Sequence, residues 1–317
     1  MKQKKENSVA LLLHWAGEQK FWLFLAILLS MCSGLCIIIP YIGIYRLMDA
    51  TFNNACTKEL VVQTVAMIAA AVTLRFALFG CSGVAAHKGA YGALFKVRCM
   101  VAEHMARAPL GALNERRTGD IKTVLNEDIE KLELFLAHNV PELICYLIGP
   151  VVVFIYLLTV NVPLALVSLV PLVLALFVMC GMFMGASSMM GRANQSVANL
   201  NSVMVEYISG MKLIKAYNKS FQKFSAAVKE ENDVWNEMSK RMGPFYASFI
   251  VVIECGMLLL VPLGGMFFLN GSITASVFLL FAFVGSMYLT EIRPLQEISS
   301  NMAQVLKAVT KTEEILE

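Results

Sequence analysis

Residues Val205–Val228 read VEYISGMKLIKAYNKSFQKFSAAV and contain the sharpest break in a very long helical pattern. Upstream, the chain is almost continuously apolar from Pro163 to Met190, then turns polar but stays compatible with a helix to Ser209. Gly210 interrupts this pattern, because glycine is poor in a helix interior and common just past a helix end. The residues that follow, Met211–Tyr217, have the spacing of a short helix. The sequence therefore predicts a short helix at the end of a long one.

The length of the upstream helix indicates where the short helix lies. The 48 residues from Pro163 to Gly210 would form a helix of about 70 Å. A bilayer core is only about 30 Å thick. The chain from Phe221 to Leu269 is first amphipathic and then apolar, so a second long helix is expected to return. Two helices are therefore predicted to project about 40 Å beyond the membrane, and Met211–Tyr217 would join them at the tip.

The composition is typical of a polytopic membrane protein. Hydrophobic residues make up 58% of the 317 residues and charged residues 15%. Residues 1–20 are expected to form an amphipathic segment along the membrane surface. Six further segments are long enough to cross the membrane: Phe21–Tyr45, Val61–Val84, Phe135–Thr159, Val162–Met184, Pro244–Leu269 and Ile273–Thr290. The net charge of +3 gives no indication of nucleic-acid binding, and no such partner is expected.

Lysine and arginine residues indicate the orientation. Four lie in the first 20 residues, eight in Ala85–Lys131 and eight in Met184–Met242, while the turns between spans three and four and between spans five and six hold none. By the positive-inside rule both termini and both long excursions, about 85–134 and 185–243, are cytoplasmic.

The first excursion repeats the design of the second. A helix is expected to run to about Ala108, and Thr118-Gly119-Asp120 would open a short helix that continues through Ile121. Thr118 is suited to cap that helix, and Asp120 would lie favourably in its first turn. Each excursion thus carries one short helix near its tip.

Three stretches of this chain resemble the transmembrane domain of ABC exporter-type (type IV fold) transporters. ISGMKLIKAYNKSFQKF, within residues 208–224, is similar to the second cytoplasmic loop of that family. PLGALNERRTGDIKTVLNED, residues 109–128, resembles the first loop, and VTKTEEILE, residues 309–317, resembles the segment that leads to the ATPase domain. Their order and spacing match over essentially the whole chain. The resemblance implies an all-α, domain-swapped fold with six membrane helices over residues 21–317.

The resemblance also implies a function, namely a permease domain that works by alternating access, most simply as an exporter. A second copy or a homologous subunit would complete the pathway. ATP and Mg would bind to nucleotide-binding domains beyond the linker at 296–317 or on another chain, since no G-x-x-x-x-G-K-[ST] motif occurs in this sequence. The implied coupling residues are Thr118, Gly119, Asp120 and Ile121 in the first loop and Ser209, Gly210, Met211, Leu213 and Ile214 in the second.

Motifs for catalysis or metal binding are missing from the sequence. Neither H-E-x-x-H nor G-x-S-x-G occurs. The eight cysteines include no C-x-x-C pair and fit neither a disulfide framework nor a metal site. This chain by itself is therefore expected to be neither an enzyme nor a metalloprotein.

Two charged residues fall near the middle of membrane spans, where a charge is costly unless it is paired or faces water. Counting from the inner ends of their spans, Arg75 and Glu254 lie within about 2 Å of the same depth. They are either a polar point on the translocation pathway or a structural ion pair between neighbouring helices. Glu291 and Arg293, near the inner end of the sixth span, are expected to be interfacial anchors.

Other functions remain open on the sequence alone. Residues 14–50 faintly resemble the siderophore-uptake branch of the exporter fold, which would mean import. An ATP-independent carrier and a structural scaffold are alternatives from other classes. The substrate, whether a small molecule, a lipid or a peptide, is not indicated by the apolar spans. The expected location is the bacterial cytoplasmic membrane.

Overall fold

The computed structural model describes residues 8–109, 118–217 and 222–316, and within these ranges the chain forms helices and short turns with no strand. This confirms the predicted all-α class. The chain divides into two compact units, which we call the first unit (Met1–Ala165 with Leu260–Glu317) and the second unit (Leu166–Leu259).

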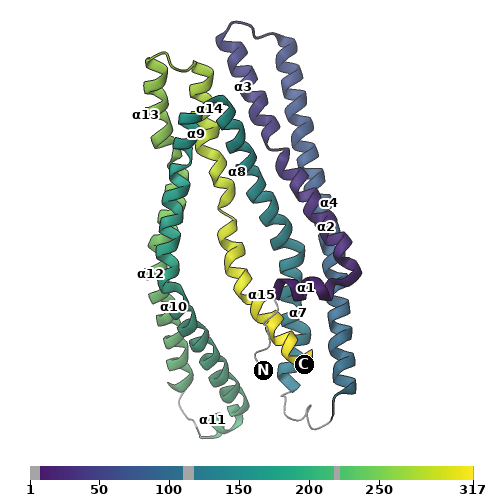
Figure 1. Ribbon diagram of the computed structural model, residues 1–317. Helices are drawn as coiled ribbons and strands as arrows, with labels where there is room; N and C mark the ends of the chain where they lie inside the picture. The colour runs from purple at the N-terminus through teal and green to yellow at the C-terminus, as the bar shows by residue number, and fades with distance from the viewer. Residues whose placement is uncertain (1–7, 110–117, 218–221, 317) are drawn as a thin grey trace, which may run out of the picture. The chain divides into compact units, whose positions relative to one another are not determined.

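The first unit contains most of the helices (Figure 1). In chain order these are α1 (Ser8–Ala16), η1 (Gly17–Gln19), α2 (Lys20–Leu35), α3 (Ile38–Phe52), α4 (Lys58–Arg107), α6 (Thr118–Thr123), η2 (Val124–Asp128), α7 (Ile129–Glu133), η3 (Leu134–Asn139), α8 (Val140–Val160), α14 (Ala275–Met287), η4 (Tyr288–Ile292) and α15 (Leu295–Leu316). The segments η2 and η3 are π-helical, whereas η1 and η4 are 3₁₀-helical.

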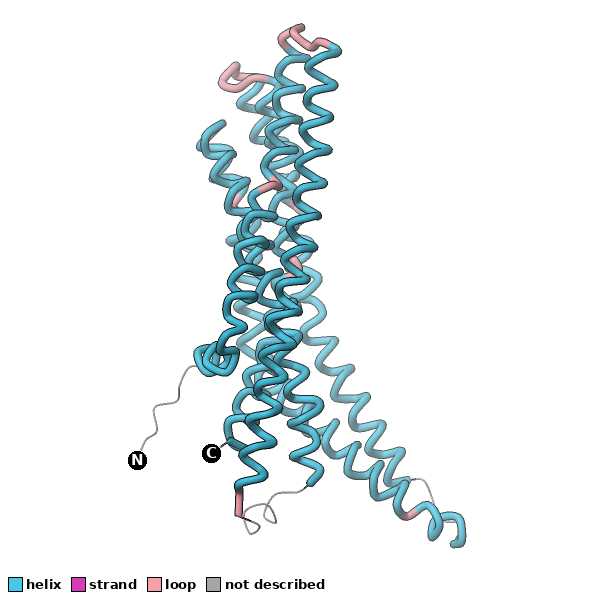
Figure 2. Tube along the Cα trace, turned by 90° about the vertical axis from the view of Figure 1, so that its right-hand side faces the viewer, coloured by secondary structure: helices cyan, strands magenta, loops and turns pink. Residues whose placement is uncertain are grey.

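The second unit is a helical hairpin. It contains α10 (Val170–Ser209), α11 (Met211–Tyr217) and α12 (Gln222–Glu254). The helices α9 (Val162–Ser168) and α13 (Gly256–Leu269) contain the boundaries between the units. Figure 2 shows that most of the described chain is helical and that short loops connect the helices.

Six helical stretches in the described residues are long and apolar enough to cross a membrane, which agrees with the number that the sequence predicts. The first stretch is not one continuous helix, because α2 ends at Leu35 and α3 begins at Ile38. Pro40 explains this break. Its ring lacks an N–H and clashes with the carbonyl of the residue four positions earlier, which is Cys36.

Small side chains bring α2 and α4 close together. Ala26, Ser30 and Ser82 are almost completely buried between them. The Ser82 hydroxyl donates to the Ala26 carbonyl over 2.7 Å, and the Ser30 and Ser82 hydroxyl oxygens are 2.8 Å apart. Small residues let membrane helices approach closely, and their hydroxyl groups then bond across the contact.

A larger core lies where α1, α4, α7 and α15 meet. Leu12 and Trp15 of α1 are buried against α4, together with Ile129 of α7 and Val309 of α15. Figure 1 shows α1 running crosswise to α2 and α4. The N-terminal and C-terminal helices of the chain are thus packed into one apolar cluster.

Candidate functional site

The first candidate site is an ion pair within the apolar helices of the first unit. Arg75 Nη2 of α4 lies 3.3 Å from Glu291 Oε2 of η4. The Ser33 hydroxyl of α2 donates to the Arg75 carbonyl over 3.0 Å. About 30% of each charged side chain is exposed (31% and 29%), so the pair is neither sealed nor freely solvated.

Two interruptions of the spanning helices lie in the elements that surround this pair. Glu291 itself belongs to the 3₁₀ segment η4, which separates α14 from α15. The break between α2 and α3 follows Ser33 by a few residues. Short 3₁₀ segments inside helices often mark functional hinges. The ion pair therefore connects η4, the interruption between α14 and α15, to the continuous helix α4.

The partner of Arg75 in the structure is one that the sequence analysis did not propose. The structure shows its ion pair with Glu291, while Glu254 ends α12 in the second unit. Glu291 was expected only as an interfacial anchor.

The predicted tip of the second excursion is present as α11, with the bounds Met211–Tyr217 that the sequence suggested. Gly210 separates it from α10 with φ −85° and ψ 1°, which is not the left-handed conformation that favours glycine. Its N–H donates to the Glu206 carbonyl over 2.9 Å, and its own carbonyl accepts from the Ile214 N–H over 3.0 Å. The break is therefore a bend across which helical hydrogen bonding continues.

The remaining predicted coupling residues of this tip surround the bend. Ser209 is exposed, whereas Met211 and Ile214 are half-buried. Leu213 lies within α11, and its side chain is outside the described part of the structure. The backbone thus brings these residues together at one end of the hairpin.

The first predicted tip corresponds to α6, which Thr118, Gly119 and Asp120 open as expected. Their side chains lie outside the described residues, so the proposed Thr118 cap stays a prediction. Ile121, in the same helix, is nearly buried.

A buried carboxylate next to this tip escaped the sequence analysis, which noted Asp128 only as part of a resemblance. Its side chain is 3% exposed. Lys131 Nζ lies 2.7 Å from Asp128 Oδ1, and Lys311 Nζ of α15 lies 3.1 Å from Asp128 Oδ2. We call this set the Asp128 clamp. It ties the π-helical segment after α6 to the last helix of the chain.

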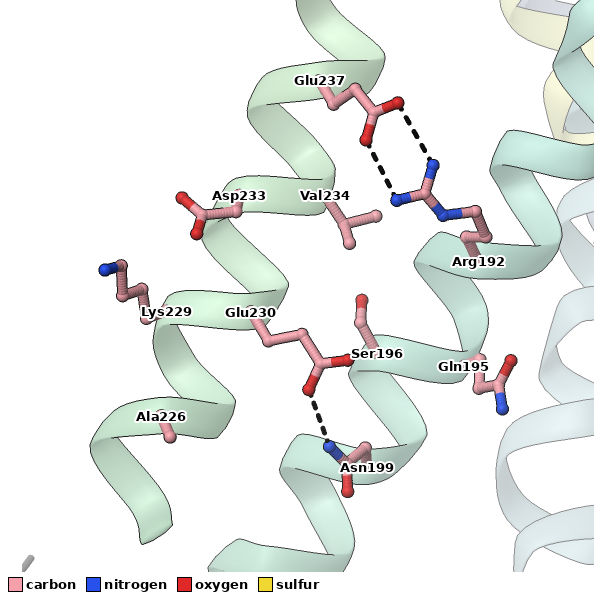
Figure 3. A pocket seen from close by; sticks show the side chains of 10 residues that line it. All are labelled: Arg192, Gln195, Ser196, Asn199, Ala226, Lys229, Glu230, Asp233, Val234 and Glu237. Atoms are coloured by element: carbon pink, nitrogen blue, oxygen red, sulfur yellow. Dashed lines mark hydrogen bonds and ion pairs between the residues drawn. The ribbon is translucent and has the colours of Figure 1, made fainter. Parts of the chain in front are cut away.

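The hairpin of the second unit carries a polar groove of about 730 Å³ between α10 and α12. Figure 3 shows that four of the polar residues that line the groove pair with each other across it. Arg192 bonds Glu237 at 3.0 and 3.1 Å, and the Asn199 amide donates to Glu230 over 3.0 Å. These bonds join the two helices, so the groove is best explained as part of the hairpin's own stabilisation. Among the described residues there is also no cluster of three or more His, Cys, Asp or Glu suited to a metal ion.

Six helices of spanning length, and in the first unit an ion pair whose side chains are about 30% exposed, are typical of an integral, multi-pass membrane protein. Comparison with known families makes the class specific. The profile described as ABC transporter transmembrane region matches residues 23–291, so the chain belongs to this family and has its exporter fold.

Individual relatives are more distant. A mycobactin import ATP-binding/permease protein, IrtA of Mycolicibacterium smegmatis, is 27% identical over 113 residues, which is 36% of this chain and 13% of the relative. The uncharacterized ABC transporter ATP-binding protein YknV of Bacillus subtilis is 23% identical over 298 residues, or 93% of this chain and 48% of the relative. An uncharacterized ABC transporter ATP-binding protein of Haemophilus influenzae is 24% identical over 190 residues, which is 59% of this chain and 33% of the relative. The chain thus spans less than half of each of these relatives.

Proposed function

We propose that this chain is the permease domain of an ATP-driven transporter that moves its substrate by alternating access. One observation in the second unit carries the proposal. The long helices α10 and α12 pack side by side, and the short helix α11 lies between them in the chain, at one end of the hairpin. A helix pair of this kind transmits a push at its tip along its whole length, because helices are stiff on this scale. Nucleotide-dependent motion beneath the tip would then bias the spans between two arrangements.

ATP and Mg would be bound by nucleotide-binding domains that dock on α6 and α11. The printed names of the relatives, which include ATP-binding functions, support this partner. A second copy of the chain, or a homologous subunit, would supply the other half of the pathway. In the proposed orientation both termini and both tips face the cytoplasm.

We place the Arg75–Glu291 pair on the translocation pathway. Ionisable groups inside membrane spans are expensive and are retained where they serve transport. Partial exposure lets either partner meet a polar group of a passing substrate or water. Glu254 stays a second candidate for the pathway.

Export is the proposed direction. The turns at Asn161 and at 270–274 are short, so those sides of the spans offer little surface on which a separate substrate-delivering protein could dock. Import is the second candidate, because the name of the Mycolicibacterium smegmatis relative specifies mycobactin import.

The test uses the chain together with its nucleotide-binding domains in inside-out membrane vesicles. ATP added to the medium should drive a lipophilic fluorescent substrate into the vesicles, and vanadate should abolish the uptake. ATP-dependent loss of a preloaded siderophore would establish import instead. Movement that is independent of ATP in both assays would contradict the proposed function.

A further inference from the structure

A notch of about 380 Å³ opens where η1 turns the chain from α1 into α2 against α4. Gly17 makes the turn with φ +54°, a conformation that favours glycine. A Cβ atom at Gly17 would collide with Lys96 Nζ, and a Cβ atom at Gly92 would lie 2.5 Å from Gln19 Cδ. The two glycines therefore allow η1 to lie close to α4 with Gln19 and Lys96 in the notch between them.

The notch lies where α2 enters its apolar span. That span is expected to begin at Phe21, and Gln19 of the notch lies two residues before it. Lys88 Nζ lies 3.7 Å from the centre of the Trp22 ring. Tryptophan concentrates at the level of lipid headgroups, and lysine extends its ammonium group towards the same level. The notch is therefore at headgroup depth.

Its charge and its surroundings suit one kind of ligand. Lys96 and one carboxylate, Glu18, line the notch, and the exposed Lys20 and Lys88 belong to the two helices beside it, α2 and α4. Phe95, which also lines the notch, is 70% exposed. A ligand with an anionic headgroup and an apolar tail would match both the positive charge and the exposed aromatic surface.

We propose that this notch binds the headgroup of an anionic phospholipid. Gln19 and Lys96 would donate hydrogen bonds to the phosphate, Lys20 and Lys88 would add positive potential, and Phe95 would contact the acyl chain. Bound lipid would then fix the angle between α1 and α2. The inference rests on the chain's place in a membrane and not on the direction or substrate of transport.

The experiment places the 317-residue chain in phosphatidylcholine nanodiscs that contain a trace of spin-labelled lipid. The label is carried either by phosphatidylglycerol, the probe, or by phosphatidylcholine, the reference. The fraction of immobilised label should be higher for phosphatidylglycerol, and each lysine near the membrane surface can contribute up to about fivefold. Lys96→Gln should lower this preference at least about twofold, while Lys96→Arg should keep it. Lys229→Gln, at an exposed position of α12 about 22 Å along the helix from the predicted span that begins at Pro244, is the matched control and should leave the preference unchanged.

Two results would overturn the proposal. One is an equal phosphatidylglycerol preference in the wild-type chain and in Lys96→Gln. The other is displacement of the lipid by millimolar inorganic phosphate, which would make the notch a simple anion site. If Lys96→Gln failed to fold, Lys96→Ala and Lys88→Gln would be compared in the same assay, and an unchanged preference in both would again reject the site.

Discussion

At the scale of single residues, Arg75 shows how a charge is accommodated among apolar helices. Its guanidinium group meets the Glu291 carboxylate, and its backbone carbonyl accepts a bond from Ser33. Removing one member of an ion pair leaves the other charge uncompensated in a medium that solvates it poorly. Removing both members avoids that cost.

We therefore predict non-additive effects at this pair. Arg75→Met should lower the free energy of unfolding by about 1–3 kcal/mol, less than for a fully buried pair because both side chains are partly exposed. Arg75→Met/Glu291→Met should regain most of the loss. Unfolding in bicelles by steric trapping would measure both values, and Arg75→Met/Glu254→Met serves as the control. A larger recovery in the control than in the Glu291 double variant would contradict the pairing.

Gly210 gives a second prediction at this scale. Because its φ is negative, alanine can adopt the same backbone conformation, although its Cβ would approach the Glu206 carbonyl oxygen to 3.2 Å. The gain in helix propensity of about 1 kcal/mol should offset that tight contact. Gly210→Ala should thus unfold within about 0.5 kcal/mol of wild type. A loss above about 2 kcal/mol would mean that the bend needs glycine itself.

At the scale of elements, the Asp128 clamp links α15 to the segment that follows α6. The contact joins residues 183 positions apart, within a core that also contains α1. In a full transporter α15 would lead towards the nucleotide-binding domain, so this clamp would couple the first tip to the linker.

Loss of the carboxylate charge should loosen α15. Asp128→Asn leaves Lys131 and Lys311 without their buried partner, at a cost of about 2–3 kcal/mol. Amide hydrogen exchange in Leu295–Leu316 should then accelerate by roughly 30- to 100-fold. Lys307→Ala, an exposed position one turn earlier on α15, is the control. Unchanged exchange in Asp128→Asn would show that apolar packing alone holds α15.

The sequence predicts elements much better than contacts. Apolar runs determine the six spans, and Gly210 marks the start of α11, because these signals are local. The break after Leu35 has a local cause as well, in Pro40. The partner of Arg75 depends on which helices are neighbours, and the Asp128 clamp depends on the packing of distant segments. Neither leaves a periodic signal in the chain.

At the scale of the whole molecule, the proposed function needs two six-helix domains for one pathway. We predict that the chain together with its nucleotide-binding domains is a dimer in lipid. Fluorescently labelled protein, reconstituted at low density, should bleach in two steps in most nanodisc particles. A large majority of single-step particles at complete labelling would contradict the dimer, and a labelled monomeric membrane protein supplies the reference distribution.

The central claim is that α11 couples ATP hydrolysis to transport. Burial of an apolar tip side chain in a partner groove contributes about 1.5–3 kcal/mol, so an acidic residue there should weaken docking strongly. Flux and ATP turnover should be measured together in proteoliposomes that contain the chain with its nucleotide-binding domains. The comparison is Ile214→Asp with Val228→Asp, an equivalent change at a 40% exposed position on α12. The account predicts that flux per ATP falls by at least about tenfold in Ile214→Asp only; an unaltered ratio in that variant would contradict it.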